Sequence, residues 1–157
     1  MSGEVLATLA PAPARRVLAL AMLWSLAGLL VLLAAERTVG FAATAFLVLM
    51  AALIGLLAEA LRHATRVALV LTNERLEDSR GRVLFEIEEI ELLDRGLFAI
   101  KPPNGFSVVL KSRRHRVWQP GLWWQLGRRI GIGGVTSPAA GKYMAEILAQ
   151  RLAKVEL

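Results

Sequence analysis

Two long stretches without a charged residue constrain this chain more than any other feature. They cover residues 17–35 and 39–58, and only Glu36, Arg37 and Thr38 separate them. About 20 apolar residues in helical conformation span a hydrocarbon core about 30 Å thick. Because lipid offers the backbone no hydrogen-bond partners, both stretches are expected to be helices. The short connection makes them antiparallel neighbours, so the sequence predicts a transmembrane hairpin.

The arginines at the ends of these stretches predict an orientation. Arg15 and Arg16 precede the first stretch and Arg62 and Arg66 follow the second, whereas Arg37 alone lies between them. The positive-inside rule therefore places both termini in the cytoplasm. A cleaved signal peptide is the alternative for the first stretch, but the run is long for one and a second run follows at once.

Small residues four apart allow two helix backbones to approach closely. Ala21 with Ser25, and Ala51 with Gly55, are such pairs, so they are expected to pack the hairpin or to bind another membrane subunit. Glu59 directly follows the second stretch, and it is expected to reach towards Arg62 and His63 at the interface, not to relay protons.

The sequence divides into three parts. Residues 1–16 contain two prolines and no periodic apolar face, so they are expected to be a flexible lead. Residues 17–61 are expected to form the hairpin, with helices at 17–35 and 39–61. Residues 62–157 suffice for one small core and are expected to form the cytoplasmic domain.

Alternating apolar residues predict an antiparallel meander in the first half of this domain. The expected strands cover residues 67–71, 75–79, 83–87, 90–92, 97–101 and 106–111. Adjacent polar residues predict a turn or bulge at 88–89. Residues 113–127 are expected to be irregular and to precede a last strand near 129–133.

Ser137 and Pro138 predict the start of a C-terminal helix, with a hydroxyl at the N-cap and proline at the first helical position. Its apolar stripe, which is expected to dock on the sheet, comprises Met144, Ile147, Leu148, Leu152 and Val155.

The segment VLTNERL at residues 70–76, the Arg80-Gly81-Arg82 hairpin and the terminal helix resemble the bacterial pleckstrin-homology-like (PH-like) domain. The resemblance is greatest to small membrane proteins in which two transmembrane helices precede that domain. It implies a membrane α-hairpin plus an α+β domain, in which a bent antiparallel sheet or barrel is closed by the C-terminal helix. The long segment 113–127 departs from the family pattern.

The resemblance also implies a non-enzymatic binding or scaffolding module in the bacterial inner (plasma) membrane. The alternative function is that of an accessory subunit in a larger membrane complex. The residues themselves offer little for catalysis, since the chain has no cysteine and only two aspartates, and His63 and His115 lack the spacing of a metal site. We therefore expect no enzymatic activity, metal or cofactor.

Five acids lie close together at Glu86, Glu88, Glu89, Glu91 and Asp94. Their carboxylates could bind a hard cation. Because they alternate with apolar residues, we expect instead that they form the solvated face of two strands.

Charge is distributed unevenly along the domain. Residues 74–94 hold eight acids and three arginines, whereas residues 95–145 hold nine lysines and arginines and no acid. Basic side chains and tryptophans are interleaved in the second region. We define this basic-aromatic segment by Lys111, Arg113, Arg114, Arg116, Trp118, Trp123, Trp124, Arg128 and Arg129.

Three interpretations of the basic-aromatic segment remain open. Its tryptophans and arginines suit a contact with anionic lipid, or with a protein partner such as a membrane protein or a second copy of the chain. Alternatively the tryptophans are core residues and the arginines are solvated. Only residues 62–66 join the second expected helix to the first expected strand, so the domain stays near the headgroups and we expect no nucleic-acid partner.

Overall fold

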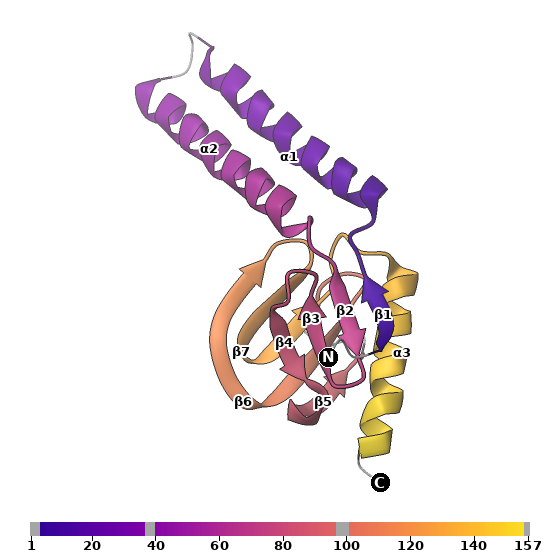
Figure 1. Ribbon diagram of the computed structural model, residues 1–157. Coiled ribbons are helices and arrows are strands. Elements are labelled where there is room, and N and C mark those ends of the chain that lie inside the picture. The colour runs from indigo at the N-terminus through magenta and orange to yellow at the C-terminus, as the bar shows by residue number, and fades with distance from the viewer. Residues whose placement is uncertain (1–3, 37–39, 97–100, 156–157) are drawn as a thin grey trace.

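The computed structural model describes residues 4–36, 40–96 and 101–155. Figure 1 shows two long helices that project from a domain of strands with one further helix. The long helices, α1 (Pro13–Ala34) and α2 (Phe41–Ala64), lie side by side and run in opposite directions. Both are long and apolar enough to cross a membrane, as the two uncharged stretches predict.

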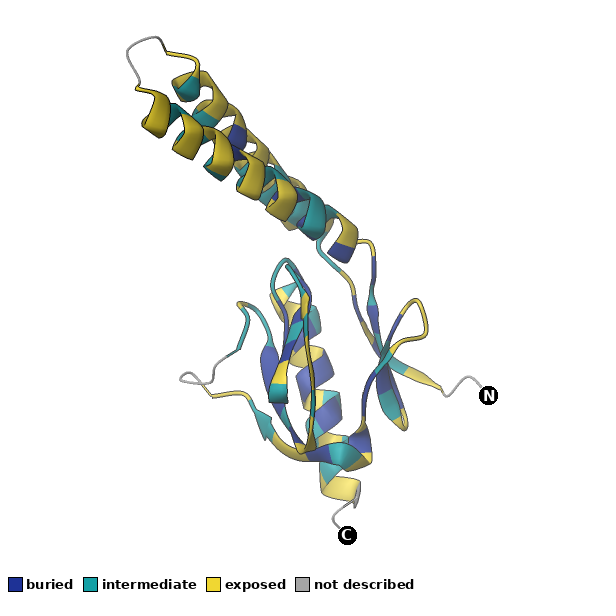
Figure 2. Ribbon diagram, turned by 90° about the vertical axis from the view of Figure 1, so that its left-hand side faces the viewer, coloured by how far each residue is buried: buried dark blue, intermediate teal, exposed yellow. Residues whose placement is uncertain are grey.

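Most residues of the two helices are exposed, as the colouring of the ribbon in Figure 2 shows. Only 6% of the most apolar 18 residues of α1 and 11% of those of α2 are buried. The helices are therefore not the core of a soluble fold, whose apolar residues would be covered. Residues 37–39 of the connection lie outside the described part of the chain.

Small residues pack the two helices against each other. The buried positions of this contact are Ala27, Ala51 and Ala58. A Cβ at Gly55 would lie 3.8 Å from the Trp24 ring, so Gly55 also takes part. Ala21 and Ser25, which were expected in the contact, are exposed. The close approach thus uses a different face of α1 from the one that the spacing indicates.

The first sheet has four strands in the order β1 (Val5–Leu9), β2 (Leu69–Thr72), β3 (Arg75–Asp78) and β4 (Val83–Glu86). All neighbours are antiparallel, and strands β2 to β4 match the predicted meander. Gly81 adopts a φ of 82° in the β3–β4 turn, a conformation that glycine tolerates without strain.

The prediction of a flexible lead at residues 1–16 is wrong for its described part. Residues 5–9 form β1, which pairs with β2 so that Leu9 lies opposite Leu69. Ala7 and Leu9 are buried, whereas Thr8 between them is exposed, as in a strand with one covered face. The domain therefore begins before the hairpin and not at residue 62.

The second sheet has the order β5 (Ile90–Asp94), β6 (Phe106–Gln119) and β7 (Trp123–Ile132). A 3-10 turn, η1 (Ile87–Glu89), joins the sheets where a turn or bulge is predicted. The expectation of an irregular segment at 113–127 is wrong, because β6 and β7 continue through it as a long curved ribbon. The predicted strand at 97–101 falls mostly on residues outside the described part of the chain.

The core lies between the two sheets and the C-terminal helix α3 (Pro138–Val155). Met144, Ala145 and Leu148 of α3 are buried, and Ile147 and Leu152 are partly covered, so the predicted docking stripe is confirmed for these described side chains. Helix α3 packs beside β1 and η1. Within the described residues the two sheets do not close into a barrel.

Candidate membrane-surface site

The hairpin joins the domain without a flexible linker. On the α1 side, the Ala12 backbone N–H donates to the Val135 carbonyl at 2.8 Å, directly before Pro13 starts the helix. On the α2 side, Thr65 is buried and its hydroxyl donates to the Leu61 carbonyl at 2.7 Å. The Ala12–Val135 hydrogen bond on one side and the burial of Thr65 on the other therefore hold the hairpin on the domain.

The turn between β6 and β7 forms a third contact with the hairpin. A Cβ at Gly121 would collide with the Leu61 side chain, and it would also approach Val135 and Thr65 at 3.2 and 3.3 Å. Gly121 has a φ of 79°, so both its backbone and its surroundings require glycine. The end of the ribbon is thus held against the last turns of α2.

A charged group marks the end of α2. Glu59 accepts hydrogen bonds from Arg62 at 2.5 and 2.8 Å and pairs with His63 Nε2 at 2.7 Å. This confirms the predicted pairing of Glu59 with these two side chains. All three are partly exposed, as expected for charged groups at a membrane interface.

The β3–β4 turn brings two further arginines to the foot of the hairpin. The Ser79 N–H donates to the Ala68 carbonyl at 2.8 Å, which places the turn beside the chain that leaves α2. Asp78 Oδ1 accepts the N–H groups of Arg80 and Arg82 at 2.9 Å each. Both arginine side chains are exposed.

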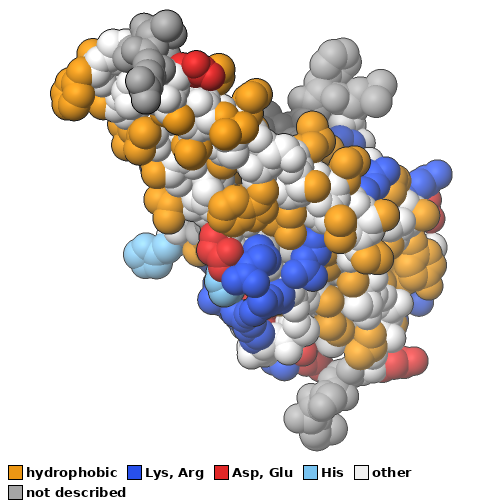
Figure 3. Space-filling model, turned by 90° about the horizontal axis from the view of Figure 1, so that it is seen from above, with side chains coloured by type: hydrophobic (Ala, Val, Ile, Leu, Met, Phe, Trp, Pro, Cys, Tyr) orange, Lys and Arg blue, Asp and Glu red, His pale blue; other side chains and the backbone are white. Residues whose placement is uncertain are grey.

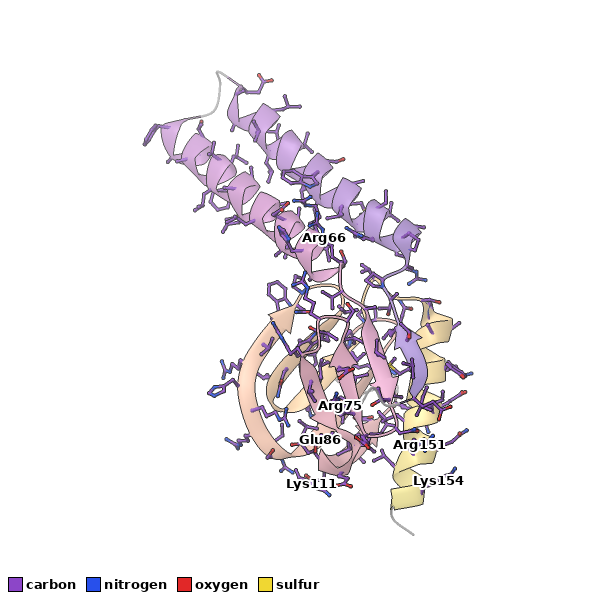
Figure 4. All side chains as sticks on the ribbon, in the orientation of Figure 1. Arg66, Arg75, Glu86, Lys111, Arg151 and Lys154 are labelled. Atoms are coloured by element: carbon purple, nitrogen blue, oxygen red, sulfur yellow. The ribbon has the colours of Figure 1, made fainter. Side chains whose placement is uncertain are left out.

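Arg66, Arg80 and Arg82 form what we term the foot cluster. Figure 4 shows Arg66 beside the end of α2, and Figure 3 shows lysine and arginine side chains gathered around the foot of the hairpin. Sequence reasoning missed this cluster because the pairing of β2 with β3 brings together residues that are distant in sequence. The Arg80-Gly81-Arg82 turn was the one feature of the sequence from which part of the foot cluster could have been predicted.

Three of the predicted basic residues make hydrogen bonds or ion pairs within the domain. Lys111 Nζ donates to the Glu88 carbonyl at 2.7 Å. Arg114 binds the Glu89 carboxylate at 2.5 and 2.6 Å and also donates to the Leu84 carbonyl. Arg128 pairs with Glu91 and donates to the Leu110 carbonyl, where the β6–β7 ladder is interrupted. These cations connect the ribbon to its neighbours.

The same pairs correct the expectation for the acidic residues. Glu89 and Glu91 are ion-pair partners of arginines and not only a solvated face. Hydrogen bonding from the Glu86 N–H and from the Arg114 guanidinium lowers the pKa of the Glu89 carboxyl below its ordinary value. Glu89 is therefore ionised at neutral pH.

The three predicted tryptophans occupy different environments. Trp123 is buried in the core, and its indole N–H donates to Gln119 Oε1 at 2.9 Å. The Trp124 ring covers Gly131, where it leaves no room for a side chain. Trp118 is 64% exposed. Core packing thus accounts for Trp123, whereas Trp124 is half-buried against Gly131 outside the core and Trp118 is exposed.

Arg113 and Arg116 are exposed on β6, and Arg129 is half-buried on β7. Within residues 4–36, 40–96 and 101–155, the side chains of these three arginines make no hydrogen bond or ion pair. The structure therefore does not hold the nine predicted residues in one site. It leaves Arg113, Arg116 and Trp118 available on the surface of β6.

No group of three or more His, Asp or Glu side chains that could hold a metal ion occurs in the described part of the chain. His63 is engaged with Glu59 at the foot of the hairpin, and His115 is exposed on β6. Comparison of the chain with protein-family models, curated proteins and solved structures finds no match.

Proposed function

We propose that this chain is a non-enzymatic protein of the bacterial inner membrane that holds a PH-like binding or scaffolding domain at the cytoplasmic membrane surface. The pairing of β1 with β2 carries this proposal. Because one strand precedes the hairpin and the other follows it, both ends of the hairpin lie on the same side as the domain. The domain cannot then move away from the membrane on a linker.

The arginine distribution supports the cytoplasmic side. Arg15 and Arg16 at the start of α1, and Arg62 and Arg66 at the end of α2, lie at the domain end of the hairpin. Positive charge at the end of a transmembrane helix favours the cytoplasmic side.

Labelling of single cysteines tests this location, since the chain has none of its own. Glu36→Cys lies beyond α1, and Gln150→Cys lies on the exposed face of α3. In cells with a permeabilised outer membrane, an impermeant thiol reagent should label Glu36→Cys and should reach Gln150→Cys only after lysis. Labelling of Gln150→Cys before lysis would contradict the cytoplasmic location.

Anionic lipid is the partner that suits the foot cluster. Each arginine close to an anionic surface contributes about 1 kcal/mol, so the change of Arg80 and Arg82 together to Gln should weaken binding on the order of thirtyfold. The full-length protein in mild detergent would be titrated with short-chain phosphatidylglycerol and, for comparison, with phosphatidylcholine.

A matched control for this titration changes Arg151 and Lys154 to Gln. Figure 4 places both at the end of the domain away from the hairpin. The net charge falls by the same amount, but phosphatidylglycerol binding should stay within about twofold of the original protein. Equal losses in both variants would contradict a role for the foot cluster.

An accessory subunit of a larger membrane complex is the second candidate function. A hollow of about 690 Å³ on the hairpin, lined by Trp24 and by small and aliphatic residues that include Gly28 and Ala52, favours it. A helix of another subunit could fill this space. Extraction in mild detergent followed by sizing separates the two functions: a defined stoichiometric complex supports the subunit, whereas a small homogeneous species supports the module.

A further inference from the structure

We infer that the outer face of the β6–β7 ribbon inserts into the headgroup layer of the membrane that the hairpin spans. The inserting side chains are Trp118 and Leu126, with Arg116 beside them. This inference rests on the proposed membrane anchorage and adds to it the side of the domain that faces lipid.

The outer face carries apolar side chains that the domain does not cover. Trp118 is 64% exposed and Leu126 is 54% exposed. Trp118 lies opposite Trp124 in the β6–β7 register. Leu126 follows Trp124 by two residues and therefore lies on the same face of the ribbon. A shallow depression of about 320 Å³ connects these residues, lined by Arg116, Val117, Trp118, Trp124, Gln125 and Leu126.

The end of the ribbon lies at the level of the headgroups. The uncharged stretch of α2 ends at Ala58, and Leu61, which contacts the turn at Gly121, is about 4.5 Å further along the helix. Each headgroup layer is about 5 to 7 Å deep. Trp118 is one residue before the end of β6, so its indole is within reach of this layer.

The inclination of the hairpin turns the outer side of the ribbon towards the bilayer. Figure 1 shows the hairpin leaning over the side of the domain on which β6 lies, and α2 contacts β6. When the hairpin stands along the membrane normal, this side of the domain approaches the membrane surface, whereas the lower end of α3 points away from it. The hydrogen bonds and packing at the junctions hold this arrangement.

The side chains on this face have the chemistry of a lipid interface. Indole rings collect among headgroups because one end of the ring system is apolar and the N–H can be hydrated. A guanidinium such as that of Arg116 is attracted to lipid phosphates. The end of the ribbon also packs on Leu61 of α2, so the patch lies close to the domain end of the hairpin. The occupant that fits is therefore lipid of the same membrane.

Three leucines of nearly equal exposure provide the test. Leu126 is 54% exposed, Leu92 on β5 is 55% exposed, and Leu49 near the middle of α2 is 56% exposed. Each would be changed to Cys in the full-length chain and labelled with an environment-sensitive fluorophore. The labelled proteins would be reconstituted in phosphatidylcholine and phosphatidylglycerol vesicles with a quencher attached to the lipid headgroup, to the upper acyl chain or, for Leu49→Cys, to the end of the acyl chain.

We expect at least threefold stronger quenching at Leu126→Cys than at Leu92→Cys. Trp118→Ala should reduce the quenching at position 126 by about half, because the indole is one of the two apolar anchors. A thermal unfolding midpoint unchanged from that of the original protein would show that each labelled variant is folded.

Quenching at position 126 no stronger than at position 92, with strong quenching at Leu49→Cys from the acyl chain, would overturn this inference and leave the membrane anchorage standing. Absence of quenching at Leu49→Cys would overturn the anchorage itself. A blue-shifted fluorophore at position 126 that lipid quenchers do not reach would indicate a protein occupant and would also overturn the inference.

Discussion

The hairpin and the sheet domain use the same aliphatic side chains in opposite ways. Leu49 of α2 is exposed, as are many other leucines and valines on both long helices, whereas Leu9, Leu69 and Leu148 of the domain are buried. Neither arrangement alone is unusual, but one continuous chain contains both. The difference is the one expected if the hairpin faces lipid, as proposed, and the domain faces water, with the change at the charged end of α2, from Glu59 to Arg66.

The hairpin and the domain are separate in space, but the domain is not one continuous segment of the sequence. The domain starts with β1, the hairpin follows, and the domain resumes with β2, so the hairpin is an insertion between two adjacent antiparallel strands. Insertion at such a site is tolerated because the two chain ends that leave the sheet are close together. The domain therefore owes its core to residues on both sides of the hairpin.

Removal of the hairpin should have the largest effect when β1 is lost with it. The fragment 62–157 lacks β1, so it loses Ala7 and Leu9 from the core and leaves one edge of β2 unpaired, and we expect it to be unfolded or aggregated. A chain in which four Gly and Ser residues join Ala12 to Arg66 keeps β1 and should fold. Circular dichroism should show cooperative melting for the joined chain and no cooperative melting for the fragment 62–157. Equal melting of the two would contradict the insertion.

Substitution of arginine for two leucines of nearly equal exposure, one in α2 and one in the domain, should show that one site faces lipid and the other faces water. Leu49→Arg places a charge near the middle of α2, where lipid raises the cost of insertion by about 2.5 to 3.5 kcal/mol. Leu92→Arg, in the domain, is expected to change stability by less than about 0.5 kcal/mol, as most exposed substitutions do. The fraction of protein that stays in the membrane after an alkaline wash measures the effect. Similar retention of both variants would mean that α2 does not face lipid.

Glu89→Gln should have a smaller effect that is confined to the domain. The Glu89 carboxylate is partly exposed, so its loss should cost about 1 kcal/mol, after allowance for screening by solvent. The pKa of Glu89 is lowered on folding, so its contribution is present above the ordinary pKa of about 4.3 and is lost as the pH falls through the folded value.

Thermal unfolding of the full-length protein in detergent between pH 3 and pH 7 tests whether the contribution of Glu89 to stability is lost at low pH. The midpoint of the original protein should fall more steeply towards pH 3 than that of Glu89→Gln. Glu88→Gln is the control, because Glu88 is exposed and its carboxylate makes no hydrogen bond or ion pair with the described residues. An equal flattening of the pH dependence in Glu88→Gln would rule out a special role for Glu89.

Local patterns were sufficient to predict much of the fold. The two uncharged stretches predict α1 and α2, and short-range alternation predicts β2 to β5 within a few residues. The apolar stripe of α3 identifies its docking face because helical periodicity is also local. The pattern that predicts each of these elements can be recognised within a window of about ten to twenty residues.

The missed elements depend on distant partners. Strand β1 is five residues long, contributes Ala7 and Leu9 to the core and pairs with a strand beyond the hairpin, so its own sequence gives little signal. The outer part of β6 was missed because residues 113–116 are four consecutive polar residues, and a curved ribbon with register shifts does not keep a regular alternation.

The candidate site was harder to predict than the fold. Residue type alone grouped Arg114 with Arg116, yet Arg114 binds Glu89, 25 residues away in sequence, and Arg116 is exposed. Trp123 and Trp118 likewise belong to the same sequence cluster, but one is core and the other is surface. The face of a strand on which a residue lies depends on the pairing register, and the register cannot be derived from composition.

The pairing of β1 with β2 around the hairpin is the central claim, and a disulfide tests it most directly. Thr8 lies opposite Val70, within the 4.4 to 6.8 Å separation of Cα atoms that a disulfide allows. Glu77 lies opposite Val70 on the other side, about 10 Å from Thr8. In isolated membranes under mild oxidation, Thr8→Cys with Val70→Cys should form an intramolecular disulfide in nearly all molecules, and Thr8→Cys with Glu77→Cys should form almost none. Failure of the Thr8–Val70 pair to cross-link, or equal cross-linking of both pairs, would contradict the account.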